Sequence, residues 1–385
     1  MCLQRNQEKE VIFHQEDVVA NNPSLIVEES EALDRISEED QRDMSIHVSP
    51  SNIMDSIEDT DKTSITPSNS ENITAAKRQD FIRCKTFKSN DWGLVIGASL
   101  RGKSHMESGL GCQDFHLYEE LGKGWYLLIV SDGAGSAEYA ERGSRGNCNV
   151  ASKLFKEMLS TNGWIDDSFF PSELEWYIEC RSIFEKMKLI YRSKAKEQND
   201  GTEESDFNAT IILCLITPMG LLVTHIGDGR MGYLSELDEW KSMMTPHKGE
   251  EANQTLFLQG PWTTPHVPAL RVSGVTVPEV KVIRGTPKAI VLMSDGCERA
   301  AWECSIYNDL KGRYEDVNLP HPAFMNPLLE SINVESEDRL QLLIDIMDRG
   351  TRACEQERDD KTMLIAIKKN SNELSDIQTG QADCY

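Results

Sequence analysis

The chain has 385 residues, enough for one large domain or two ordinary ones. Its 64 Asp and Glu residues outnumber its 40 Lys and Arg residues and give a net charge of -24. Because so acidic a surface repels the phosphates of nucleic acids and of anionic membranes, we expect no nucleic-acid binding and no membrane binding. The sequence also contains no apolar run of about 18 residues, the signature of a membrane-spanning helix.

The cysteines, the histidines and the start of the chain predict a cytoplasmic protein. The first residues, MCLQRNQEKE, contain no apolar core after their charges and do not resemble a secretory signal. None of the ten cysteines forms a CxxC pair, and we interpret them as reduced and mostly buried. A zinc site needs clustered Cys or His ligands, and the eight histidines are dispersed along the chain.

The first part of the chain differs in composition from the rest. Residues 1–80 contain 18 Asp and Glu, 7 Lys and Arg, and a single aromatic residue, Phe13. Such a segment cannot bury enough apolar surface to offset the entropy lost on ordering. We therefore predict an acidic, disordered extension over residues 1–85, with a phosphorylated regulatory tail as the alternative. A flexible tail is expected over residues 371–385.

Short runs rich in Val, Ile and Leu begin near residue 91 and end at Gly, Asp or Pro, which predicts β-strands. Several of these runs are continuously apolar rather than alternating, so we expect those strands to be buried on both faces. The runs are GLVIGASL (93–100), WYLLIVSDG (125–133), NATIILCLIT (208–217), GLLVTHIGDG (220–229), AIVLMSDG (289–296) and TMLIAIK (362–368).

Helical patterns separate the predicted strands. One helix is expected to start near Ser136, a second covers residues 172–196, and a third spans about 335–350. The Pro-Met-Gly turn between 208–217 and 220–227 makes those two strands an antiparallel hairpin. The predicted fold class is α+β, with sheets in the middle and helices outside. Residues 236–285 contain several Pro and Gly and suggest an insertion.

Aspartates stand at the ends of several predicted strands. Asp132, Asp228 and Asp295 each follow an apolar run and are each followed by glycine, in VSDGAGS, IGDGR and MSDG. Asp359 and Asp360, in DDKT, precede the last run. A single Asp-Gly pair is typical of a turn. A charge at the end of a buried strand is unfavourable unless it is paired or binds a cation, so the recurrence indicates a shared site.

Converging carboxylates of this kind suit hard divalent cations. Without a cation they would repel one another and raise one another's pKa values, whereas Mg²⁺ or Mn²⁺ prefers such oxygen ligands. Two cations roughly 3.5–4 Å apart can hold a shared water, and the resulting hydroxide can attack a phosphoryl group in line. The chain has no GxSxG, HExxH or P-loop string that would favour another mechanism.

Five segments resemble the type 2C metal-dependent Ser/Thr protein phosphatases, and the bacterial branch most closely because its first aspartate motif reads DGAGS. The likeness covers about residues 91–368. Each segment alone is a weak signal, and their shared order makes the resemblance specific. The segments are GASLRGKSHMESGLGCQD (97–114), VSDGAGSAEYAERGS (130–144), HIGDGRMGYL (225–234), VLMSDG (291–296) and DDKTMLIAI (359–367).

The resemblance implies a fold and a set of metal ligands. The phosphatase domain would cover residues 91–370 as a four-layer α-β-β-α sandwich, with two antiparallel central sheets flanked by helices. Asp132 would bridge two divalent cations, Mn²⁺ or Mg²⁺, and the Gly133 carbonyl would bind one of them. Asp295 and Asp359 would complete the two sites, so that Asp132, Asp295 and Asp359 are the expected catalytic residues.

The resemblance also assigns lesser roles and shows two departures. Asp114 would act through metal-bound water, and Asp228 would lie near a weaker third cation or support the rim of the site. Ala134 stands where many members carry a histidine proposed as the general acid. An arginine that grips the substrate phosphate in many members is replaced by Gly-Lys-Ser-His. The candidates for that phosphate-binding role are Arg101, Lys103 and His105.

The implied function is a metal-dependent protein phosphatase that hydrolyses phosphoserine and phosphothreonine through a metal-bridging hydroxide. Its expected partners are a phosphoprotein substrate and a cognate Ser/Thr kinase with that kinase's targets. The alternative is a catalytically weak pseudophosphatase that binds phosphoproteins or serves as a scaffold, which the two departures favour. The retained aspartates favour the enzyme.

Overall fold

The computed structural model of the chain describes residues 92–198, 200–248, 255–262, 277–304, 306–333 and 338–368. The predicted extension over 1–85 and the predicted tail over 371–385 lie outside the described residues, and both stay predictions. Within the described ranges, no helix combines the length and the apolar character needed to cross a membrane. The cysteines in these ranges are free, and all of them except Cys304 are buried.

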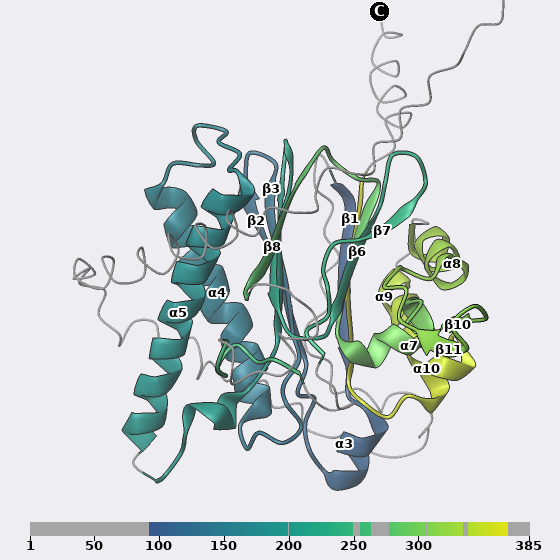
Figure 1. The fold of residues 1–385 in the computed structure, drawn as a ribbon, viewed down its shortest axis with the longest axis horizontal. Helices are drawn as coiled ribbons and strands as arrows, with labels where there is room; N and C mark the ends of the chain where they lie inside the picture. Colours follow the sequence, from purple (N-terminus) through teal and green to yellow (C-terminus); the bar gives the residue numbers. More distant parts are fainter. Residues whose placement is uncertain are drawn as a thin grey trace, which may run out of the picture. The chain divides into compact units, whose positions relative to one another are not determined.

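Two five-stranded antiparallel sheets form the centre of the described part of the chain, and they lie face to face in Figure 1. The first sheet has the order β1-β12-β9-β6-β7, so strands from opposite ends of the domain are neighbours. Its strands are β1 Trp92–Leu100, β12 Lys361–Lys368, β9 Ala289–Met293, β6 Arg230–Leu234 and β7 Trp240–Ser242. The second sheet consists of β2 Phe115–Gly122, β3 Trp125–Ser131, β4 Ile211–Thr217, β5 Gly220–Ile226 and β8 Glu279–Arg284, in that order.

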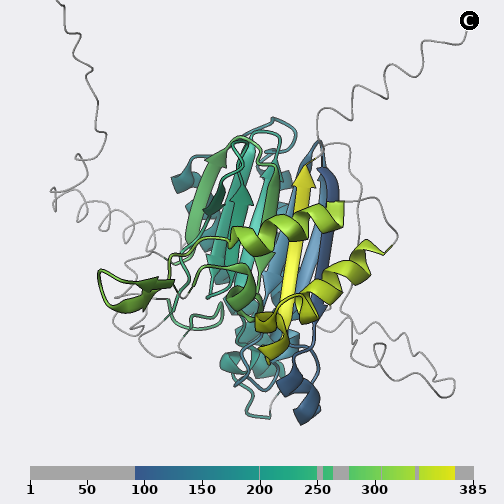
Figure 2. The same ribbon diagram turned by 90° about the vertical axis from the view of Figure 1, so that its right-hand side faces the viewer.

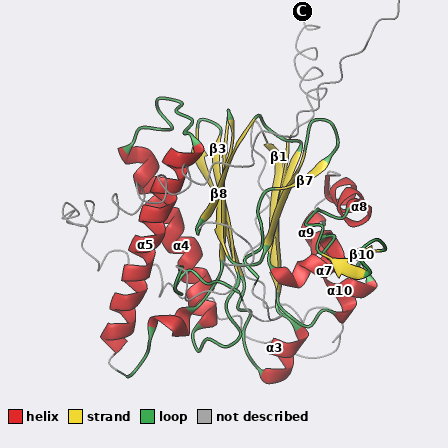
Figure 3. Cartoon of the chain, in the orientation of Figure 1, coloured by secondary structure: helices red, strands yellow, loops and turns green. Residues whose placement is uncertain are grey.

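Helices cover the outer face of each sheet, as Figures 1 and 3 show. The second sheet carries α4 Ala140–Thr161 and α5 Glu173–Gln198. The first sheet carries α7 Glu298–Ala301, α8 Pro322–Asn333, α9 Arg339–Arg349 and α10 Arg352–Gln356. Figure 2 shows α8 and α9 lying across its strands. The remaining elements are α3 Lys103–Ser108, two short 3₁₀ helices, η1 Glu204–Phe207 and η2 Asp295–Cys297, and a hairpin of β10 Ile306–Asn308 and β11 Arg313–Glu315. The predicted four-layer α-β-β-α sandwich is confirmed.

Three apolar layers hold these elements together: one between the sheets and one between each sheet and its helices. Strand β5 shows how one strand serves two layers. Leu222 and Ile226 pack toward α4 and α5, whereas Leu221 and Val223 face the other sheet. Since successive side chains of a strand point to opposite faces, burial on both faces requires the continuous apolar runs seen in the sequence.

The six predicted strands correspond to β1, β3, β4, β5, β9 and β12, and the predicted helices to α4, α5 and α9. The interpretation of residues 236–285 as an insertion is wrong, because this segment supplies β7 and β8 as edge strands of the two sheets. The β8 sequence EVKVIR alternates polar and apolar residues and is only partly buried. An edge strand of this kind lacks the apolar run that identifies a central strand.

Candidate metal centre

The strand register brings the predicted aspartates to matching strand ends. Asp132 directly follows β3 and Asp114 directly precedes β2, whose terminal residues Ser131 and Phe115 pair with each other. In the other sheet, Asp295 lies just beyond β9 and Asp359 lies just before β12. The paired residues Met293 and Met363 connect those two ends. Segments up to about 245 residues apart in the sequence therefore contribute to one site.

The carboxylates act strongly on one another. Burial raises the pKa of Asp132 well above its ordinary value, and the neighbouring charges of Asp114, Asp295 and Asp359 raise it further. Burial also raises the pKa of Asp295, and the like charges of Asp228 and Asp359 raise it further. These shifts show that one small region collects several carboxylates, each of which makes ionisation of the others less favourable.

Asp114 is the most completely buried member of this group, with 1% of its surface exposed. Burial, together with the nearby charge of Asp360, raises its pKa to about 7. Its Oδ2 accepts a 2.7 Å hydrogen bond from the Ser294 hydroxyl, and that hydroxyl accepts the backbone N–H of Thr362 at 2.9 Å. Asp114 is thereby fixed to the first sheet although it belongs to the second.

The backbone of Asp132 and Gly133 is held in place from two sides. Thr210 receives the Asp132 N–H on its hydroxyl at 3.0 Å and donates its own N–H to the Asp132 carbonyl at 2.8 Å. Gly133 donates to the carbonyl of Gln113 at 3.1 Å. A Cβ at Gly133 would lie 2.6 Å from the Ala140 carbonyl oxygen, so only glycine fits there.

Asp359 and Asp360 occupy different environments. Asp359 is exposed at the site, whereas Asp360 is buried. The two carboxylate oxygens of Asp360 accept the backbone N–H groups of Gly102 at 2.6 Å and Gln113 at 2.5 Å. Asp360 therefore fastens the loop between β1 and β2 to the start of β12. Sequence reasoning did not identify this role, and the paired aspartates of DDKT were the available signal.

The three predicted phosphate-binding cations lie on or next to α3. Arg101 donates to the Leu110 carbonyl at 3.2 Å, and Lys103 donates to the Glu355 carbonyl. His105 Nδ1 lies 2.9 Å from the Asp360 carboxylate. All three side chains are engaged within the protein, so a substrate phosphate would have to replace these contacts. Their assignment stays a prediction.

Asp228 lies at the side of the cluster, next to a network of opposite charges. Burial raises its pKa, while the positive charge of Lys248 acts in the other direction. Lys248 contacts both carboxylate oxygens of Glu298, at 2.7 and 2.8 Å. Glu298 in turn pairs with the fully buried Arg230 at 2.9 Å. This partial compensation distinguishes Asp228 from Asp132 and Asp295.

The donor set fits hard divalent cations. Asp114 Oδ1 and Asp295 Oδ1 are buried and accept no hydrogen bond from any described residue. Burying such an atom without a partner is unfavourable, and a cation would satisfy both oxygens and offset the carboxylate repulsion. Ligands that are all oxygen favour Mg²⁺ or Mn²⁺ over softer metals.

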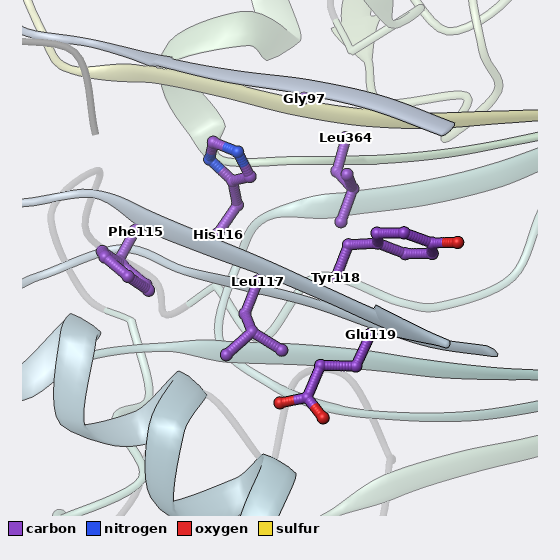
Figure 4. Close-up of a pocket in the computed structure, with 7 residues that line it drawn as sticks. All are labelled: Gly97, Phe115, His116, Leu117, Tyr118, Glu119 and Leu364. Atoms are coloured by element: carbon purple, nitrogen blue, oxygen red, sulfur yellow. The ribbon is translucent and has the colours of Figure 1, made fainter. Parts of the chain in front are cut away.

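A pocket of about 120 Å³ lies apart from these carboxylates, and Figure 4 shows its lining. His116 and Tyr118 of β2 point toward Leu364 of the other sheet, whereas Leu117 and Glu119 point away from it. None of the predicted site residues lines this pocket. The lining comes from β1, β2 and β12.

A family model described as protein phosphatase 2C matches residues 101–345, more than half of the chain. The chain belongs to the protein phosphatase 2C family. The matched range contains Asp114, Asp132, Asp228 and Asp295, and it ends before Asp359. A comparison with curated proteins finds no match.

Solved phosphatase structures are also similar to this chain. The serine/threonine phosphatase Stp1 from Staphylococcus aureus is 12% identical, with 72% of this chain and 95% of that chain covered and a TM-score of 0.45. Serine-threonine phosphatase 2C from Toxoplasma gondii is 12% identical, with 75% and 98% covered and a TM-score of 0.49. The S. agalactiae serine/threonine phosphatase is 14% identical, with 71% and 99% covered and a TM-score of 0.44.

Ala134, where the sequence resemblance led us to expect a histidine, is buried in defined surroundings. Its side chain is 7% exposed, and its N–H donates to the Asn208 carbonyl at 2.9 Å. A methyl group here can neither donate nor accept a proton. Any proton needed by a leaving group would have to come from elsewhere in the site.

Proposed function

We propose that the chain is a metal-dependent phosphatase that hydrolyses phosphoserine and phosphothreonine in proteins. The observation that carries this proposal is the buried carboxylate cluster, in which Asp132, Asp114 and Asp295 have raised pKa values and two of their oxygens accept no hydrogen bond from a described residue. A cluster so unfavourable without a counter-charge is consistent with a cation site. Membership of the protein phosphatase 2C family supports the same reaction.

Each residue of the proposed site would have a distinct role. Asp132, the Gly133 carbonyl, Asp295 and Asp359 would hold two divalent cations, Mn²⁺ or Mg²⁺. Those cations, when bound, would supply an activated water and neutralise the charge of the phosphoryl group. Asp114, held by Ser294, would orient water at the edge of the site. Asp228 would support a third divalent cation that binds more weakly than the other two.

The proposed reaction requires a phosphoprotein as substrate, and we infer a cytoplasmic signalling role opposite a Ser/Thr kinase. Ala134 and the engaged state of Arg101, Lys103 and His105 favour the second candidate, a pseudophosphatase that binds phosphoproteins without efficient turnover. The two candidates share one fold and one cation site. They differ in whether metal-loaded protein turns substrate over.

The test is hydrolysis of p-nitrophenyl phosphate and of a phosphothreonine peptide by the purified chain with Mn²⁺, with Mg²⁺ and with EDTA. We expect turnover that requires metal and falls by at least about a hundredfold in Asp132→Asn, in line with the loss of a group that stabilises transition-state charge. Asp166→Asn is the matched control, because Asp166 is exposed and pairs with Lys123 at 2.7 Å. Metal binding without turnover would contradict the enzyme and support the pseudophosphatase.

A further inference from the structure

The hairpin of β10 and β11, with the residues that follow it up to Pro320, forms an arm with apolar side chains on its surface. Its two strands make a sheet of their own, which no third described strand joins. In Figure 2 this hairpin arm projects, in green, away from the strands of the two large sheets. Its exposed apolar and aromatic residues are Ile306, Tyr307, Leu310, Tyr314, Val317 and Leu319. Apolar groups that gather on an exposed arm indicate an interaction surface.

The base of the hairpin arm is fixed to the body of the domain. The buried Arg230 guanidinium donates to Asp316 at 2.6 Å and to Asn318 at 2.8 Å. The Asn318 side chain also accepts the indole N–H of Trp302 at 3.0 Å and donates to the Met244 carbonyl at 2.8 Å. These contacts set the direction of the arm, and a surface oriented in advance loses less entropy on binding than a flexible one.

Strand β11 has a free edge. β10 pairs with one side of it, with Tyr307 opposite Tyr314 and Asn308 opposite Arg313, and no described strand pairs with the other side. In an antiparallel pair, alternate residues direct their N–H and C=O groups away from the partner strand. β11 therefore offers backbone donors and acceptors to an added strand.

The sequence of β11 is complementary to itself. Its three residues are Arg313, Tyr314 and Glu315. In an antiparallel pair of two β11 strands centred on Tyr314, each Arg313 faces the Glu315 of the second copy and the two Tyr314 residues face each other. Opposite charges and aromatic rings directly across a strand pair stabilise it. The β10 sequence, Ile-Tyr-Asn, offers no such match of charges.

The same register also matches the exposed apolar residues. Tyr307 lies directly across from Tyr314, so the two share one face of the hairpin, with ring centroids 5.2 Å apart. Pairing through β11 would extend this row with the tyrosines of the second copy. Leu310, which is 99% exposed, would lie beside Val317 and Leu319 of the second copy. One register thus accounts for the free edge, the charges and the apolar residues.

We propose that the chain forms a two-fold symmetric homodimer through β11, in which the two hairpins join into one continuous antiparallel sheet. Two-fold pairing uses the same edge of both chains and closes the assembly. Because strands of three residues make a small interface, we expect a weak dimer with a Kd of about 1–100 µM. Within one chain Glu315 already contacts Arg313 at 3.1 Å and Lys311 at 2.9 Å, and the dimer would share these contacts between the copies.

The test measures the mass of the full-length protein by sedimentation velocity over a range of concentrations that spans this Kd. Physiological ionic strength is needed, because the net charge of -24 on each chain opposes association at low salt. We expect an equilibrium between monomer and dimer. Arg313→Glu and Glu315→Arg each place like charges across the interface at two symmetric positions, so each should raise the Kd by about a hundredfold.

A mixture of the two variants separates an effect at the interface from damage within one chain. The Arg313→Glu chain carries two glutamates on β11 and the Glu315→Arg chain carries two arginines, so opposite charges face each other only in the mixed dimer. The mixture should form dimers although each variant alone stays monomeric. Arg349→Glu is the matched control, because Arg349 is an exposed cation on α9 that pairs with Asp345 at 2.8 Å, and it should dimerise like the wild type.

Four outcomes would overturn the proposal. Wild-type protein that stays monomeric at every concentration would show that β11 does not bind a second copy. A dimer that neither variant weakens would place the interface elsewhere, and oligomers larger than a dimer would exclude the closed pairing. A mixture that stays monomeric would exclude the proposed register, with circular dichroism as the check that both variants fold. Since association is measured without a phosphatase assay, the result is independent of the proposed activity.

Discussion

Neighbouring residues of the same type, Asp359 and Asp360, have different physical roles. Asp360 satisfies two buried backbone N–H groups, those of Gly102 and Gln113. Asp359 is exposed and acts through space on Asp132, whose pKa it helps to raise. Asp360 thus stabilises a loop, whereas Asp359 contributes charge to the proposed metal site. Substitution of the two residues should therefore have different effects.

Asp360→Ala should lower the free energy of unfolding by about 2–5 kcal/mol, because it leaves two buried N–H groups without acceptors. Asp359→Ala should change that free energy by less than about 1 kcal/mol, as expected for an exposed side chain, and should remove metal-dependent hydrolysis. Urea denaturation in EDTA measures the first quantity, and the p-nitrophenyl phosphate assay measures the second. Wild-type stability in Asp360→Ala would refute the proposed role of its two hydrogen bonds.

At the scale of elements, the turn between β3 and α4 determines where Asp132 lies. Gly133 and Gly135 both belong to the DGAG string but differ in their surroundings. A Cβ at Gly133 would lie 2.6 Å from the Ala140 carbonyl oxygen and 2.8 Å from that of Gln113. A Cβ at Gly135 would meet nothing within 4 Å. Only the first glycine is required by the close approach of two other segments.

Gly133→Ala should destabilise the protein by about 1–3 kcal/mol, since the clash is with backbone atoms that cannot move independently. It should also weaken Mn²⁺ binding, because the shift moves Asp132 and the Gly133 carbonyl. Gly135→Ala is the matched control and should match the wild type in both respects. Urea denaturation and calorimetric Mn²⁺ titration of the two variants provide the comparison, and indistinguishable results would exclude this steric argument.

For the molecule as a whole, the cation site and the stability of the fold are coupled. The chain carries a net charge of -24, and its interior adds carboxylates whose pKa values are raised by burial and by one another. For Asp114 the pKa rises from 3.8 to about 7. The folded, metal-free protein therefore retains a proton at pH values where the unfolded chain has already released it.

The sign of the pH dependence follows from that difference. In EDTA, the stability contributed by Asp114 is complete below about pH 4 and is lost as the pH rises toward about 7, since the unfolded chain ionises first. Mn²⁺ should restore stability near pH 7 because it favours the ionised carboxylates. Thermal unfolding between pH 5 and 7.5, with EDTA and with Mn²⁺, measures both effects. A metal-free protein that gains stability over this range would contradict the carboxylate assignment.

Local patterns in the sequence were sufficient for the central strands and for the aspartates at their ends. The runs that became β3, β4 and β5 are mostly apolar and are buried at every position, because both faces of the strand are covered. The edge strand β2 was missed because FHLYEELG combines apolar residues with adjacent glutamates. The order of the strands, such as the pairing of β1 with β12, depends on contacts that no local pattern encodes.

The sequence by itself determined the buried strands, the fold class and the recurrence of aspartate at strand ends, because each depends on neighbouring residues and on the period of a strand. Only the tertiary structure decided which side chains meet. It placed Asp360 against two backbone N–H groups and brought His225, His247 and Glu279 together. Histidines that are dispersed in the sequence become neighbours because the pairing of β5 with β8 and the path of the chain after β7 close long loops.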